Sequence, residues 1–152
     1  MAALPTSERI AVIVPALNEV ENVEPLVRQI LECLPNCAEI IIVDDGSTDG
    51  TPARVRELAV SLPVCLLERA NPAFGLAGAV IAGARLAQAP VLVVMDADLS
   101  HPPSQIEHLI EPLLDDRADL VVGSRYVRGG STPGWPVYRR VMSRTAAALA
   151  YP

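Results

Sequence analysis

The chain has 152 residues, of which 51% are hydrophobic and 20% are charged, a composition typical of a single globular domain. Its apolar runs are much shorter than the ~20 residues of a membrane-spanning helix, and residues 1–8 lack the pattern of a signal peptide. The formal net charge of −6 argues against nucleic acid as a partner. Together these features predict a cytoplasmic domain that does not bind nucleic acid.

The first predicted strand, residues 10–14, is a β-branched run that ends before a proline. Asn18 and Glu21 have the spacing of a capping box, in which the two side chains satisfy the first free N–H groups of a helix. Apolar residues at helical spacing follow as far as residue 34. The start of the chain therefore predicts a strand followed by a helix.

The same order repeats further along. Residues 40–43 predict a second strand, which leads into an acidic and glycine-containing stretch over residues 44–50. Thr51 is expected to cap the next helix, because a proline stands at the first helical position after it. Residues 64–67 predict a third strand.

In the remainder of the chain, residues 75–87 predict a helix with a small inner face, which allows it to pack close to a sheet. Residues 91–95 predict a fourth strand and residues 120–122 a fifth. A last helix is predicted near residues 137–149. Strands that are apolar throughout and alternate with helices indicate an α/β fold with a mostly parallel central sheet and helices on both faces.

Polar residues follow four of these strands, where ligands bind in parallel α/β sheets. The first strand leads into Pro15, Leu17, Asn18 and Glu19. The second ends in two consecutive aspartates, the fourth in Asp96-Ala97-Asp98, and the fifth leads into Gly123-Ser124-Arg125. We expect all these groups to meet at one edge of the sheet, and this convergence points to a ligand site more strongly than any single motif does.

Asp96 and Asp98 are two carboxylates separated by one residue at the end of a core strand. Such a pair suits a divalent cation, because Mg²⁺ is usually held by one or two carboxylates together with phosphate oxygens. Two other interpretations stay open. The pair can be solvated loop residues, or it can be the Asp-x-Asp motif of a haloacid-dehalogenase-type phosphatase, with Asp96 as nucleophile and Asp98 as acid.

Charge is divided unevenly along the chain. Residues 1–119 contain all 18 acidic residues, whereas residues 120–152 contain five arginines and no acid. This basic end, with Trp135 and an apolar run over 146–151, predicts contact with an anionic group at a membrane surface. Two alternatives stay open. The basic residues can form a solvated face, and Trp135 and the apolar run can complete the core.

Three stretches resemble the family 2 glycosyltransferases: VPALNE at 14–19, VDDGSTDGT at 43–51 and MDADLSHP at 95–102. The GSRY stretch at 123–126, with the later glycines, Trp135 and paired arginines, resembles the dolichol-phosphate (polyprenol-phosphate) mannosyltransferase branch. The resemblance covers nearly the whole chain. Each motif alone is common, but their order and spacing together are specific.

This resemblance implies a GT-A (Rossmann-like) three-layer fold and a metal-dependent, inverting hexosyltransferase. The expected donor is a nucleotide sugar, with GDP-mannose favoured over UDP-glucose. The expected acceptor is a polyprenyl or dolichyl phosphate, which places the domain at the cytoplasmic face of a membrane in peripheral contact with its surface. Neither base nor sugar is fixed by the motifs.

The resemblance also implies roles for individual residues. Those implied in donor binding are Pro15, Leu17, Asn18, Glu19, Asp44, Asp45 and Asp96. Those implied in holding Mg²⁺ or Mn²⁺ are Asp96, Asp98 and Ser100. Asp98, Arg125 and Arg144 are the implied catalytic residues, and the acceptor phosphate is expected to contact Arg125, Arg139, Arg140 and Arg144.

Residues 1–8 are expected to be a flexible N-terminus and residues 9–152 to form the GT-A domain. Members of the family typically continue further, so the resemblance implies a C-terminally truncated domain, with a nucleotide-sugar-binding but inactive fragment as the alternative. The family pattern has Tyr where Leu17 stands and a basic residue near Ala73. Two features argue against the phosphatase. Its motif normally ends the first strand, whereas three strands precede Asp96, and its usual lysine is missing from a chain without lysine.

Overall fold

The computed structural model describes residues 10–35, 39–124, 127, 136–138, 141–143 and 145. Its elements are β1 (Ile10–Ala16), α1 (Val20–Cys33), β2 (Glu39–Asp44), α2 (Thr51–Leu58), β3 (Val64–Glu68), α3 (Gly75–Leu86), β4 (Val91–Val94), the 3₁₀ helix η2 (Pro103–Gln105) and α4 (Ile106–Leu114). The chain divides into two compact units, Met1–Val121 and Val122–Pro152. All the named elements belong to the first unit.

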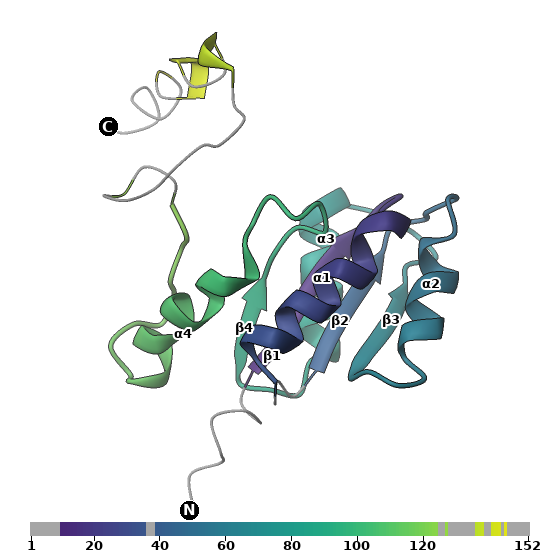
Figure 1. Ribbon diagram of the computed structural model, residues 1–152, viewed down its shortest axis with the longest axis horizontal. Coiled ribbons are helices and arrows are strands. Elements are labelled where there is room, and N and C mark those ends of the chain that lie inside the picture. Colours follow the sequence, from purple (N-terminus) through teal and green to yellow (C-terminus); the bar gives the residue numbers. More distant parts are fainter. Residues whose placement is uncertain are drawn as a thin grey trace, which may run out of the picture. The chain divides into compact units, whose positions relative to one another are not determined.

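The four strands form one parallel sheet in the order β3-β2-β1-β4 (Figure 1). Central β1 pairs with β2, where Ala16 is the register partner of Asp44, and with β4, where Ile13 is the partner of Val94. Consecutive strands joined by helices must cross over in this way to stay parallel. The predicted α/β fold with a parallel sheet is confirmed.

Helices cover both faces of the sheet, as Figure 1 shows, with α1 and α2 on one side and α3 on the other. Alternate β1 residues supply the two cores, because neighbouring side chains of a strand point to opposite faces. Val12 and Val14 face the α1 side and Ile13 faces α3. A Cβ atom on Gly83 of α3 would lie 2.5 Å from Ile13 Cγ2. The predicted close packing of this helix is therefore confirmed.

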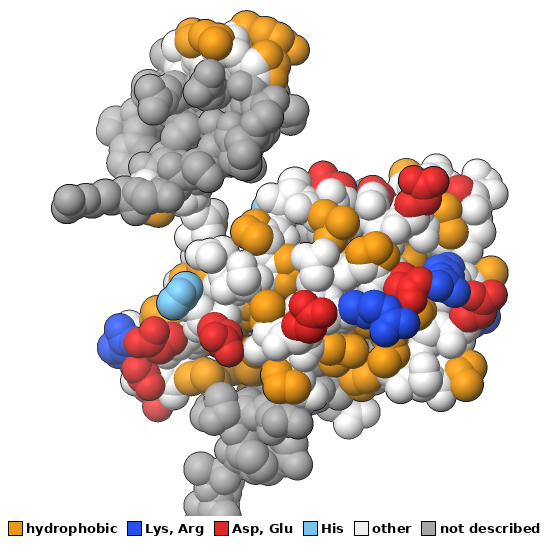
Figure 2. All heavy atoms as spheres, in the orientation of Figure 1, with side chains coloured by type: hydrophobic (Ala, Val, Ile, Leu, Met, Phe, Trp, Pro, Cys, Tyr) orange, Lys and Arg blue, Asp and Glu red, His pale blue; other side chains and the backbone are white. Residues whose placement is uncertain are grey.

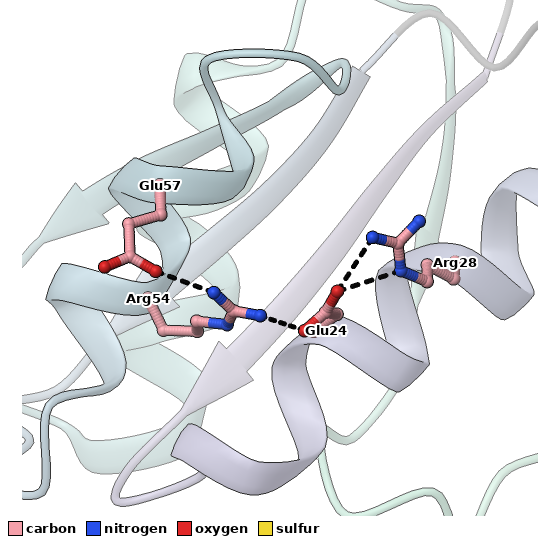
Figure 3. A network of polar contacts seen from close by, with 4 residues as sticks. All are labelled: Glu24, Arg28, Arg54 and Glu57. Atoms are coloured by element: carbon pink, nitrogen blue, oxygen red, sulfur yellow. Dashed lines mark hydrogen bonds and ion pairs between the residues drawn. The ribbon is translucent and has the colours of Figure 1, made fainter.

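A network of charged side chains joins the solvent sides of α1 and α2 (Figure 3). Glu24 accepts hydrogen bonds from Arg28 at 2.8 Å and from Arg54, and Arg54 also donates to Glu57 at 2.6 Å. Acidic and basic side chains lie beside one another over this face in Figure 2. Because these groups are solvent-accessible, the network adds little to the free energy of folding.

Two predicted helix caps are wrong. Asn18 adopts a left-handed conformation with φ of 59°, and no side chain caps α1 from within its own sequence. Thr51 lies inside α2 and is fully buried, while Gly50 occupies the position before the helix. At the start of α1 a distant residue, Asp49, accepts the Val20 N–H, whereas at the start of α2 the same Asp49 accepts the N–H of its near neighbour Thr51.

The predicted fifth strand is also wrong, because residues 120–122 have no regular secondary structure and Leu120 is exposed. Such a short run forms a strand only when a neighbour pairs with it, and none of the described strands does so. In the second unit the described residues 137, 138, 141–143 and 145 are helical, as predicted. The expected flexible N-terminus, residues 1–8, lies outside the described residues.

Candidate donor and metal site

The carboxyl ends of β2, β1 and β4 lie next to one another at one edge of the sheet. The N–H of Asp45, just after β2, donates to the carbonyl of Ala16 at 3.0 Å, and the N–H of Met95, just after β4, donates to the carbonyl of Ile13 at 3.2 Å. The sheet therefore brings together the three polar stretches that the sequence placed after these strands.

Asp44 ends β2 and is only 3% exposed. Its Oδ2 atom accepts hydrogen bonds from the N–H groups of Gly46 and Ser47, both at 3.0 Å, and so shapes the turn that follows. Its Oδ1 atom is buried and has no hydrogen-bond partner among the residues that the structure describes. A buried acceptor of this kind is costly unless a donor reaches it.

Asp49 joins the beginnings of two helices. Its Oδ2 atom accepts the N–H of Val20, the first residue of α1, at 3.0 Å. Its Oδ1 atom accepts the N–H of Thr51, the first residue of α2, at 2.9 Å and the Thr51 hydroxyl at 2.6 Å. The Thr51 hydroxyl, with the backbone N–H donors, lowers the pKa of Asp49 below its usual value, because each donor favours the charged carboxylate.

Asn18 and Glu19, predicted to bind the donor, make contacts within the protein. The N–H of Asn18 donates to Ser47 Oγ at 2.8 Å, and its Oδ1 accepts the N–H of Thr48 at 2.9 Å. The N–H of Glu19 donates to the Thr51 hydroxyl at 2.9 Å. These bonds tie the end of β1 to the β2–α2 loop, which we define as residues 45–50.

The other two predicted residues of the first motif differ in exposure. Pro15 is half-buried within β1, opposite Val43 of β2. Leu17 is 55% exposed and directly follows Ala16, which bonds to Asp45. Leu17 is thus the residue of this stretch that presents an apolar side chain to solvent beside the aspartates.

Asp45 forms an ion pair with Arg69, with 2.6 Å between Oδ1 and Nη1, and both side chains are largely buried. Sequence reasoning did not single out Arg69. A basic residue directly after β3 was the available signal, because β3 pairs with β2 and its end lies beside the aspartates. The guanidinium compensates the charge of Asp45 and fixes where its carboxylate lies.

The Asp96-Asp98 pair lies after β4 in a more open loop. The N–H of Ser100 donates to Asp98 Oδ1 at 2.9 Å, and the Ser100 hydroxyl, followed by this N–H, lowers the pKa of Asp98. His101 Nδ1 lies 3.7 Å from Asp96 Oδ2. Ser100 is thus a hydrogen-bond partner of Asp98, and His101 is a neighbour of the pair to which the sequence reasoning gave no role.

No group of three or more His, Cys, Asp or Glu side chains suited to a metal occurs among the described residues. Two carboxylates are nevertheless a sufficient protein contribution for a hard divalent ion whose other ligands are phosphate oxygens and water. Asp96 and Asp98 fit such an ion in chemical type, together with a diphosphate.

The four arginines expected to contact the acceptor phosphate, Arg125, Arg139, Arg140 and Arg144, lie outside the described residues, as does Trp135. Their roles stay predictions from the sequence. Within the part of the chain that the structure describes, no helix has the length and hydrophobicity needed to cross a bilayer.

The profile of Glycosyl transferase family 2 matches residues 11–150 of this chain. The chain belongs to this family. Membership decides between the two enzyme classes considered for the Asp96-x-Asp98 motif, in favour of a family 2 glycosyltransferase and against a phosphatase.

Curated relatives are mannosyltransferases by name. The dolichol-phosphate mannosyltransferase of Pyrococcus furiosus is 43% identical over 139 residues, which is 91% of this chain and 39% of the relative. The polyprenol monophosphomannose synthase of Mycolicibacterium smegmatis is 41% identical over 150 residues, 95% of this chain and 56% of the relative. The Saccharomyces cerevisiae dolichol-phosphate mannosyltransferase is 42% identical, over 93% of this chain and 54% of the relative. The chain thus spans about half or less of the length of these relatives.

Solved structures agree with the fold. A mannosyltransferase from Pyrobaculum calidifontis, in complex with GDP-Man and Mn²⁺, matches with a TM-score of 0.53 and 35% identity over 59% of this chain and 27% of its own. Glucosyl-3-phosphoglycerate synthase from Mycobacterium tuberculosis, with Mn²⁺ and UDP, matches with a TM-score of 0.58 and 26% identity over 69% of this chain and 39% of its own. The predicted GT-A fold is confirmed.

Proposed function

We propose that this chain is the donor-binding part of a hexosyltransferase that moves mannose from GDP-mannose to a polyprenyl phosphate, with inversion at the sugar. The observation that carries the proposal is the meeting of the β2 aspartates and the Asp96-Asp98 pair at one edge of the sheet. The names of the relatives, and the GDP-Man and Mn²⁺ in one structural neighbour, supply the substrate class.

In this proposal the two acidic stretches bind different parts of the donor. Asp44 and Asp45 face the nucleoside, where carboxylates accept hydrogen bonds from the N–H and hydroxyl groups of base and ribose. Asp96 and Asp98 hold Mg²⁺ or Mn²⁺. The ion, when bound, neutralises the negative charge that develops on the departing nucleoside diphosphate.

The acceptor side of the proposal is based on the sequence of residues 120–152, with five arginines and no acid. A phosphate monoester is already anionic, so it attacks without a strong general base, and what it needs is positive charge to approach a second anion. Arg125, Arg139, Arg140 and Arg144 would supply that charge, since guanidinium groups bind phosphate in a bidentate manner. The membrane contact and the cytoplasmic face belong to this same proposal.

Calorimetric titration tests the donor side. GDP should bind in the presence of Mn²⁺ and more weakly with a chelator, and UDP measures the choice of base. Asp45→Asn should weaken GDP binding by about 1–3 kcal/mol, the effect of spoiling a hydrogen bond to a charged group, and leave pyrophosphate binding unchanged. An equal loss for pyrophosphate would assign Asp45 to the fold instead.

A transfer assay tests the acceptor side, with GDP-mannose labelled in the sugar and vesicles that contain polyprenyl phosphate. Label in the lipid phase that requires Mn²⁺ or Mg²⁺ supports the full reaction. Donor binding without transfer would restrict the chain to a nucleotide-sugar-binding role. Failure to bind GDP or UDP under any condition would overturn the proposal.

A further inference from the structure

Phe74 has an unusual conformation and environment. It lies immediately before α3 with φ of 66° and ψ of 12°, in the left-handed region that bulky residues rarely occupy, and its side chain is 90% exposed. Both features are unfavourable for a folded chain in water, because the backbone is strained and an aromatic ring stays hydrated. Strained residues of this kind concentrate at sites that bind a ligand.

The turn that displays Phe74 is fixed to the aspartates by Arg69. The same guanidinium that pairs with Asp45 donates to the carbonyl of Gly75 at 3.1 Å and to that of Ala73. The residues on both sides of Phe74 are thus joined through one side chain to Asp45, and Arg69 itself is only 10% exposed.

The following helix holds the turn from the other side. A Cβ atom on Gly78 would lie 2.2 Å from the carbonyl oxygen of Ala73 and 2.5 Å from Arg69 Nη2. Only glycine allows this approach. The ring of Phe74 is therefore presented by a backbone that is packed and hydrogen-bonded on both sides.

Two other exposed apolar side chains stand on the chain segments next to this turn and next to the residue that bonds Asp45. Leu76 is 61% exposed in the first turn of α3, and Leu17 follows the residue that accepts the Asp45 N–H. An aromatic face and apolar side chains beside a fixed carboxylate match a planar heterocycle with N–H donors on its edge. A nucleobase has both properties, and stacking on an aromatic ring is a general mode of base recognition.

We propose that Phe74 stacks on the nucleobase of the donor nucleotide. This inference rests on the proposed nucleotide donor and adds a contact residue to it, on a segment outside the motifs that marked the site in the sequence. The ring supplies contact area to the base while Asp45, held by Arg69, lies within reach of its polar edge.

Titration of GDP in the presence of Mn²⁺ tests the stacking. Phe74→Ala should weaken binding by roughly 5- to 100-fold, the usual effect of removing a stacked ring. Phe74→Trp should retain the affinity of the wild type. Pyrophosphate with Mn²⁺ should bind equally to all variants, because it has no base.

Phe74→Gly separates stacking from strain. Glycine accepts the left-handed conformation, so this variant should be at least as stable to urea as the wild type and still lose GDP affinity as Phe74→Ala does. Val60→Ala is a matched control, since Val60 is also exposed but follows α2. It should bind GDP like the wild type.

Fluorescence gives a readout of the contact itself. In a Phe74→Trp/Trp135→Phe double variant, position 74 has the chain's single tryptophan, and GDP should quench its emission whereas pyrophosphate should not. Unchanged GDP affinity in Phe74→Ala, or an equal loss for pyrophosphate, would overturn the stacking. If Phe74→Ala bound GDP normally but no longer bound anionic vesicles, the stacking would also be overturned, and Phe74 would be a membrane contact. A wild type that binds neither GDP nor UDP would overturn the proposed function as well.

Discussion

The two acidic loops of the site are built in opposite ways. The β2–α2 loop is fixed by its own protein contacts, since Asp44 shapes its turn and Asp49 and Thr51 tie it to the start of α1. The loop after β4 has few such bonds, and Asp96 and Asp98 remain accessible. In the proposed donor site, this difference would make the nucleoside side preformed and leave the metal side to be completed by the ligand.

The largest expected effect concerns the open loop. Asp96→Ala and Asp98→Ala should each weaken GDP binding in the presence of Mn²⁺ by more than about 100-fold. In the proposal both residues bind the ion directly, and loss of a direct ligand has a larger effect than loss of a residue that hydrogen-bonds a ligand. The free energy of unfolding should change by less than about 0.5 kcal/mol, as for other exposed positions. Calorimetry and urea titration measure the two quantities.

Glu32→Ala removes an exposed carboxylate of α1 and serves as the control for loss of charge. It should leave both quantities as they are in the wild type. A marked loss of stability in the Asp98 variant would contradict the description of its loop as open.

The preformed loop should respond in the reverse sense. Thr51→Val keeps the size of a buried side chain and removes the hydroxyl that accepts the Glu19 N–H and donates to Asp49. Leaving the half-buried N–H of Glu19 unpaired should lower the free energy of unfolding by about 1–3 kcal/mol. Thr48→Val, at an exposed position of the β2–α2 loop, should have little effect. Equal stability of the two variants would mean that the Thr51 hydroxyl does not hold the β2–α2 loop in place.

The smallest effect is one of pH. Because the pKa of Asp49 is lowered in the folded protein, its ionised form stabilises the fold above the usual aspartate value of 3.8, and this contribution is lost as the pH falls through the lowered pKa. Asp49→Asn should therefore be less stable than the wild type at pH 7 and approach it below pH 3.8. Urea unfolding at several pH values measures the difference. A constant difference across that range would mean that the charge of Asp49 does not stabilise the loop.

The sequence predicted the parts of the molecule that follow from periodicity. Apolar runs gave β1 to β4, and the small residues of α3 gave its close approach at Gly83. Residue spacing also placed the acidic stretches at one edge, because parallel strands share their direction. The strand at 120–122 was wrong, since its formation depends on a partner that local pattern does not reveal.

What the sequence did not reveal are contacts between segments distant in the chain. Asn18 has the spacing of a local cap, yet its side chain accepts from Thr48, thirty positions away. Arg69 stands in no motif, and its partners are Asp45 and two carbonyls of a later turn. The exposure of Phe74 became visible only when the turn around it was known.

The position of Asp49 between α1 and α2 has a consequence for motion. Its carboxylate accepts the first backbone N–H of each helix, so we expect the starts of both helices to move together with the β2–α2 loop. Amide hydrogen exchange at Val20 and Thr51 should accordingly be slow and similar, and both should quicken together when that carboxylate is replaced. We expect the rearrangement that admits and releases the nucleotide to come from the segment after β4, which no such joint restrains.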